Sequence, residues 1–163
     1  MQTKREALLA IYRGEIPEYI PAERLAQDGV VFPGDRYFGT EKTGYDMWGV
    51  NWTNLGPDLG LDGSMVTPGT ELFDDIEKWK EYIHFPEVEK LPLQQIFDGM
   101  MTAANVDRNE QVVACLMLSG QFERLNEMMG MENALCAFYE SPEAMHEYME
   151  AMCEYKLKCI DLA

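Results

Sequence analysis

The order of apolar and polar residues predicts a chain that is mostly helical. Apolar side chains recur every three or four positions in residues 4–12, 93–104, 122–129, 131–140 and 142–160. A shorter helix is expected just before Pro86. Thr3 and Glu6 have the spacing of a capping box, which predicts where the first helix begins. Gly130 follows the apolar face of 122–129 and predicts its end.

One segment has the pattern of a strand rather than a helix. The run VVACLML, residues 112–118, is continuously apolar, has β-branched residues at its start and is bounded by polar residues. This is typical of a parallel strand that is buried on both faces. Such a strand requires parallel neighbours joined through crossover helices. The chain offers only one or two weaker strands before residue 35, so the pattern predicts part of an α/β fold.

We expect residues 1–163 to be a portion of one domain, and the pattern divides them into three regions. Residues 1–26 contain the N-terminal helix and a first strand. Residues 27–91 form an irregular region with scattered aromatic residues and one short helix, and residues 92–163 consist of helix–strand–helix units. Long irregular stretches of this kind are often functional, and buried aromatic rings give them order.

Charge and composition narrow the classes of partner. The chain has 29 acidic and 13 basic residues, a formal net charge of −16, with 47% hydrophobic residues. Such a surface repels nucleic-acid phosphates and lacks the basic patch that anionic membranes attract. No apolar run approaches the roughly 20 residues of a membrane span, and no signal peptide is evident. We therefore expect a cytoplasmic protein whose four cysteines are thiols and whose cysteine spacing matches no zinc site.

Four segments, in this order, resemble the uroporphyrinogen decarboxylase superfamily, and more narrowly the uroporphyrinogen-decarboxylase-like proteins of anaerobic bacteria. They are TKREALLAIYRGEIPEYIP, YDMWGVNW, PGTELFDDIEKWKEYIHFPEVEKL and LSGQFERLNEMMGMENALCAFYESPEAMHEYMEAM. The resemblance spans the whole chain and implies an α/β fold, the N-terminal part of a (β/α)8 TIM barrel that is incomplete in this chain. A complete barrel needs roughly 250 residues.

The resemblance favours one branch of the superfamily. The decarboxylases carry an Arg-Gln-Ala-Gly-Arg signature after the first strand, whereas this chain has AERLAQDGV, in which only Arg24 matches. The favoured function is therefore part of a corrinoid-dependent methyltransferase of the O- or N-demethylating type. Two alternatives stay open: the decarboxylase of porphyrin biosynthesis, and a non-catalytic fragment or subunit that needs a partner chain to complete the barrel.

The resemblance also implies cofactors and partners. Zinc and a corrinoid belong to the completed protein, with the zinc ligands expected after Ala163, so this chain alone is expected to hold no metal and no cofactor. The partners implied are the remainder of the barrel, from the same gene or a separate chain, a second copy in a homo-oligomer, and a corrinoid protein.

Candidate pocket residues follow from the rule that TIM-barrel active sites lie at the C-terminal ends of the strands. Ser119, Gln121 and Phe122 come directly after the apolar strand, at the start of a helix. Trp48 and Trp52 could form the wall of a site for a flat ligand. The alternatives are an ordinary strand-to-helix turn for the first three and packing of a long loop for the two indoles.

Glu23 and Arg24 are the remaining candidates. They follow the expected first strand, so both could reach the mouth of a barrel. The alternative is a surface ion pair, which contributes little to stability. The sequence itself identifies no catalytic residue and does not distinguish between substrates.

Overall fold

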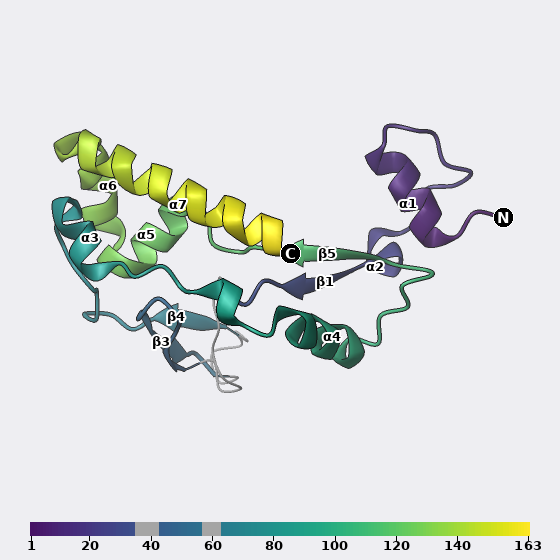
Figure 1. The fold of residues 1–163 in the computed structure, drawn as a ribbon, viewed down its shortest axis with the longest axis horizontal. Helices are drawn as coiled ribbons and strands as arrows, with labels where there is room; N and C mark the ends of the chain where they lie inside the picture. The colour runs from purple at the N-terminus through teal and green to yellow at the C-terminus, as the bar shows by residue number, and fades with distance from the viewer. Residues whose placement is uncertain (35–42, 57–62) are drawn as a thin grey trace. The chain divides into compact units, whose positions relative to one another are not determined.

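The structure, a computed structural model, describes residues 1–34, 43–56 and 63–163 (Figure 1). The chain forms two compact units. The first contains residues 1–32 and 91–116, and the second contains residues 33–90 and 117–163. Among the helices in these described stretches, none has the length and apolarity to cross a membrane.

The first unit is built on two parallel strands. Its elements are α1 (Lys4–Tyr12), α2 (Glu23–Ala26), β1 (Gln27–Val31), α4 (Leu93–Ala103) and β5 (Val112–Leu116). Strands β1 and β5 pair in parallel, from Gln27 opposite Val112 to Val31 opposite Leu116. The Phe32 N–H extends the pairing by donating to the Leu116 carbonyl at 2.8 Å.

The predicted start of the first helix is confirmed. The Thr3 hydroxyl accepts the Glu6 N–H at 3.1 Å, and the Glu6 carboxylate accepts the Thr3 N–H at 2.8 Å. These reciprocal bonds satisfy two backbone donors that a helix leaves without partners at its N-terminus. The bond from the Thr3 N–H, and to a smaller extent the Thr3 hydroxyl, lowers the pKa of the Glu6 carboxyl, because a hydrogen-bond donor favours its charged form.

The apolar strand is confirmed as a parallel strand, but its predicted burial on both faces is wrong. The side chains of β5 are half-buried, and those of Leu116 and Leu118 are 42% and 51% exposed. Among the described residues β5 pairs only with β1, so the two-stranded sheet has too few neighbours to enclose it. The apolar composition of a strand shows its tendency to be buried, not the presence of neighbours that cover it.

The predicted N-terminal part of a (β/α)8 TIM barrel is also wrong. Besides the β1–β5 pair, the described strands form a three-stranded antiparallel sheet: β2 (Gly44–Tyr45), β3 (Asn51–Asn54) and β4 (Ser64–Val66). A barrel start would link successive parallel strands through single helices. Here the residues that follow β1 include the short strands β2, β3 and β4, which pair antiparallel, and a local turn at residues 46–50 joins β2 to β3.

The second unit contains the antiparallel sheet and a group of helices. The helical elements are η2 (Ile76–Lys78), α3 (Trp79–Tyr82), η3 (Val88–Lys90), α5 (Gln121–Met129), α6 (Met131–Glu140) and α7 (Pro142–Leu162). Helix α7 lies beside α5 and α6 (Figure 1). Its buried side chains Tyr148 and Tyr155 meet Trp79 and Trp48 edge to face, with ring centres 5.9 and 5.0 Å apart.

Gly130 ends α5 and precedes α6, as predicted. Its backbone has φ +82° and ψ 155°, a conformation that side-chain-bearing residues rarely adopt. A Cβ built there would meet the Glu71 side chain at 3.5 Å, an ordinary contact. The constraint at this corner is therefore the backbone itself and not the surrounding space.

We expect Gly130→Ala to destabilise the protein by about 1–3 kcal/mol, because it places a Cβ on a strained backbone. The matched control is Gly99→Ala inside α4, where a Cβ meets nothing within 4 Å. That change is expected to stabilise the helix by about 0.5–1 kcal/mol. Urea denaturation followed by circular dichroism measures both. Equal effects of the two substitutions would contradict the assignment.

Candidate functional site

Four buried polar side chains of the second unit form one group, which we call the Arg124 cluster: Asp46, Ser119, Arg124 and Glu127. The Arg124 Nη1 lies 3.1 Å from Asp46 Oδ2 and 2.8 Å from Glu127 Oε2. Its Nη2 donates to the Ser119 Oγ at 3.3 Å, and that hydroxyl lies 3.4 Å from Glu127 Oε1. One guanidinium thus joins two carboxylates and a hydroxyl.

Asp46 is positioned by the turn that follows β2. Its Oδ1 accepts the backbone N–H groups of Trp48 at 2.8 Å and Val50 at 3.0 Å. Its Oδ2 accepts the indole N–H of Trp52 at 3.0 Å. An aspartate that binds the backbone of the next residues shapes its own turn. The turn therefore holds the carboxylate in the position where it meets the Arg124 guanidinium.

Arg124 and Glu127 are positioned by α5, on which they stand three residues apart and so share a face. The guanidinium carbon of Arg124 lies 5.0 Å from the centre of the Trp48 ring, within range of a cation–π contact. Its side chain is 1% exposed, and those of Asp46 and Glu127 are 0% and 5% exposed. Enclosed to this degree, the cluster is suited to holding the β2–β3 turn against α5 and not to meeting a substrate.

Tyr148 lies close to the Arg124 cluster on α7. Its hydroxyl donates to the Gln121 carbonyl at 2.8 Å, which joins α7 to the first residue of α5. Burial raises the pKa of the Tyr148 hydroxyl above its ordinary value of 10.0 because the charged form loses solvation. The positive charge of Arg124 lowers the pKa by a smaller amount, and the negative charge of Glu127 raises it.

The three candidates that follow β5 do not converge on one point. The Ser119 side chain is enclosed in the Arg124 cluster. The Gln121 amide donates to the Cys153 Sγ at 3.6 Å, on an exposed part of α7. Phe122 is half-buried, and its ring centre lies 5.7 Å from that of Phe138. The first residue of the turn points inward and the other two lie toward the surface of α6 and α7.

Trp48 and Trp52 are 4% and 3% exposed. The Trp48 indole donates to the Gly34 carbonyl at 3.0 Å, and the Trp52 indole donates to Asp46. Both rings are packed inside the second unit. Glu23 is exposed and stands at the start of α2, in the first unit, before β1 and not after a strand. Arg24 belongs to the same helix, and its side chain lies outside the described residues.

Sequence reasoning missed Asp46, Arg124 and Glu127, the charged members of the cluster. Two signals were available. Arg124 and Glu127 stand next to the apolar positions Leu125 and Met128, so they border the buried face of their helix. Asp46 precedes a Trp-Gly pair, as a turn-forming aspartate does. Neither signal pairs the residues, because 78 positions separate Asp46 from Arg124.

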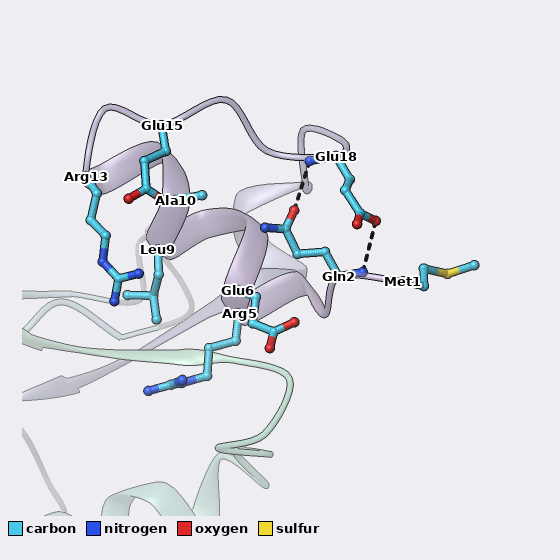
Figure 2. A pocket seen from close by; sticks show the side chains of 9 residues that line it. All are labelled: Met1, Gln2, Arg5, Glu6, Leu9, Ala10, Arg13, Glu15 and Glu18. Atoms are coloured by element: carbon cyan, nitrogen blue, oxygen red, sulfur yellow. Dashed lines mark hydrogen bonds between the residues drawn. The ribbon is translucent and has the colours of Figure 1, made fainter.

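Figure 2 shows a different kind of feature, an open hollow of about 550 Å³ in the first unit. It is lined by polar side chains of α1 and by the chain that follows it, including Arg5, Arg13 and Glu15. The Gln2 side chain accepts the Glu18 N–H at 2.9 Å, and the Glu18 carboxylate accepts the Gln2 N–H at 3.1 Å. This reciprocal pair holds the N-terminus against residues 15–18.

The described residues offer no group of three or more His, Cys, Asp or Glu side chains that could hold a metal ion. Comparisons of the chain with protein-family models, curated proteins and solved structures found no match. The resemblance to the uroporphyrinogen decarboxylase superfamily therefore stays a prediction from sequence.

We expect Arg124→Met to destabilise the second unit by about 3–5 kcal/mol, because it leaves Asp46 and Glu127 buried without the guanidinium. The matched control is Lys90→Met, which breaks the exposed Lys90–Glu87 pair and should leave the denaturation midpoint unchanged. Tryptophan fluorescence during urea denaturation measures both. A shift of Arg124→Met no larger than that of the control would contradict a structural role.

The raised pKa of Tyr148 predicts a loss of stability at alkaline pH. The unfolded chain ionises this hydroxyl near pH 10, whereas the folded chain resists ionisation until higher pH. The stability it contributes is full below pH 10 and falls as pH rises above that value. We expect Tyr148→Phe to flatten this fall, while Tyr139→Phe, at a 91% exposed position, leaves it unchanged. Thermal melts between pH 8 and pH 12 test this, and parallel curves for the two variants would contradict it.

Proposed function

We propose that the chain takes part in corrinoid-linked methyl transfer as a uroporphyrinogen-decarboxylase-like protein that works in the cytoplasm. The observation that supports this most directly is the Arg124 cluster. It joins YDMWGVNW, which supplies Asp46 and Trp52, to LSGQFERLNEMMG, which supplies Ser119, Arg124 and Glu127. These are two of the segments that carry the resemblance. The two segments are therefore in direct contact in the folded chain.

The charges favour methyl transfer over porphyrinogen decarboxylation. A porphyrinogen with eight carboxylates needs cations that are available to bind it. Near the residues that follow β5, the guanidinium of Arg124 is enclosed and already bonded to Asp46 and Glu127. The chain as a whole carries −16. Methyl ethers and methylamines, the substrates of O- and N-demethylation, carry no such set of carboxylates and need no cations to bind them.

The proposal gives this chain a limited chemical role. A corrinoid supplies a metal that accepts and donates a methyl group. The described residues do not fit a zinc site, so no step through zinc is assigned to them. Gln121 and Phe122, at the start of α5, are the candidates for contact with the substrate, because both are half-buried beside the exposed Cys153 and Phe138. Tyr148 holds this turn through the Gln121 carbonyl.

A second candidate is a non-catalytic subunit that works with a partner chain. The observation that favours it is β5, an apolar parallel strand with half-buried side chains and one described neighbour. A two-stranded sheet is marginal alone, and further strands from another polypeptide would cover it. In this reading Leu116 and Leu118, which are exposed here, become buried on assembly.

Two assays on the purified chain separate these functions. The purified chain is mixed with reduced cobalamin and either an aryl methyl ether or a methylamine, and the loss of cobalamin(I) absorbance is followed. We expect loss that depends on the protein, at least tenfold slower for Gln121→Ala than for the control Gln94→Ala on α4. Release of carbon dioxide from uroporphyrinogen instead would indicate the decarboxylase. A folded chain with neither activity would contradict methyl transfer and favour the subunit.

A further inference from the structure

Strand β5 has an edge with which no other described strand pairs, and we call it the free edge. The opposite edge pairs with β1 along the whole strand, and the Phe32 N–H donates to the Leu116 carbonyl there. Alternate residues of a strand direct their backbone groups to opposite edges. The register therefore places the N–H and carbonyl groups of Val113 and Cys115 on the free edge, away from β1.

The free edge lacks the features that prevent edge strands from pairing with other chains. Charged side chains and prolines are the usual protection, and an exposed apolar edge without them is a site of strand pairing. Residues 112–118 contain no charged residue, no proline and no glycine. Strand β1 differs, because Asp28 and Gly29 stand within it. Of the two strands in this sheet, β5 is therefore the one whose edge favours a further strand.

We propose that the free edge pairs with β5 of a second copy of this chain, antiparallel, about a two-fold axis at Ala114. In this register Val113 of each copy exchanges both backbone hydrogen bonds with Cys115 of the other. Val112 lies opposite Leu116, so apolar side chains meet across the pair. The two two-stranded sheets become one sheet of four strands, and a stable sheet needs three or more.

Polarity and charge favour a second copy in this orientation. An uncharged apolar edge matches another uncharged apolar strand, and β5 alone is wholly apolar among the described strands. The chain carries −16, so two copies repel wherever their carboxylates meet. Antiparallel pairing centred on Ala114 places the two Glu110 residues about 26 Å apart, at roughly 3.3 Å per residue, whereas parallel pairing would set them side by side. Salt screens charges beyond about 8 Å at physiological ionic strength.

The first test locates the two-fold axis. Directly opposed residues of an antiparallel pair that exchange no hydrogen bonds lie about 4.5 Å apart at Cα, within the range of a disulfide. Ala114→Cys should therefore link two copies on mild oxidation, measured on a non-reducing gel. Both variants carry Cys136→Ser and Cys153→Ser, because those thiols are exposed. The matched control, Ala103→Cys at an exposed position of α4, should link about tenfold more slowly. Equal rates would overturn the proposal.

The second test removes one backbone donor from the free edge. Val113→Pro deletes the outward N–H and leaves the bonds to β1, which come from the alternate residues. The matched control, Val113→Ala, also shortens the side chain but keeps the N–H. In sedimentation velocity, wild type and Val113→Ala should approach twice the 18.7 kDa chain mass as concentration rises.

Val113→Pro should need about tenfold higher concentration to associate, because each dimer loses two hydrogen bonds. Circular dichroism shows whether it is folded. Wild type that is monomeric at every concentration, or equal association of the two folded variants, would overturn the proposal. The inference rests on the subunit reading of the proposed function, for which it names the partner. The mass measurement needs no substrate, so its outcome is separate from that of the cobalamin assay.

Discussion

The second unit depends on one guanidinium that is almost completely removed from water. Charge in such a place is unfavourable unless other charges and dipoles surround it. Arg124 receives these from a helix neighbour, Glu127, and from a distant turn, through Asp46. The β2–β3 turn also depends on the Asp46 carboxylate, which accepts two backbone N–H groups of that turn. The same group of atoms therefore shapes the β2–β3 turn and holds it against α5.

Around this polar centre the packing is aromatic. Trp48 contacts the guanidinium on one side and the Tyr155 ring on another, and Phe85 lies against both rings. The Tyr155 hydroxyl and the Trp48 indole both donate to the Gly34 carbonyl, at 3.1 and 3.0 Å. Large rings with one polar atom each can fill the core and still satisfy a buried carbonyl. This combination orders a region that is otherwise rich in glycine and short polar side chains.

Features governed by neighbouring residues were predictable from the sequence, and features governed by distant residues were not. The capping box at Thr3, the helices from residue 93 onward and the Gly130 corner depend on a few adjacent positions, and all are present. The parallel character of β5 followed from its composition, but its burial depends on how many strands surround it. The Arg124 cluster requires Asp46 and Arg124 to be matched across 78 positions, for which a single sequence gives no signal.

The positions of the tryptophans have a practical consequence. The chain has three, Trp48, Trp52 and Trp79, and all of them lie within the second unit and are 3–6% exposed. Intrinsic emission excited in the indole band therefore reports on that unit alone, and the β1–β5 strand pair is spectroscopically silent in such a measurement. An emission transition that precedes or follows the change in far-ultraviolet ellipticity would reveal that the two units lose their order separately.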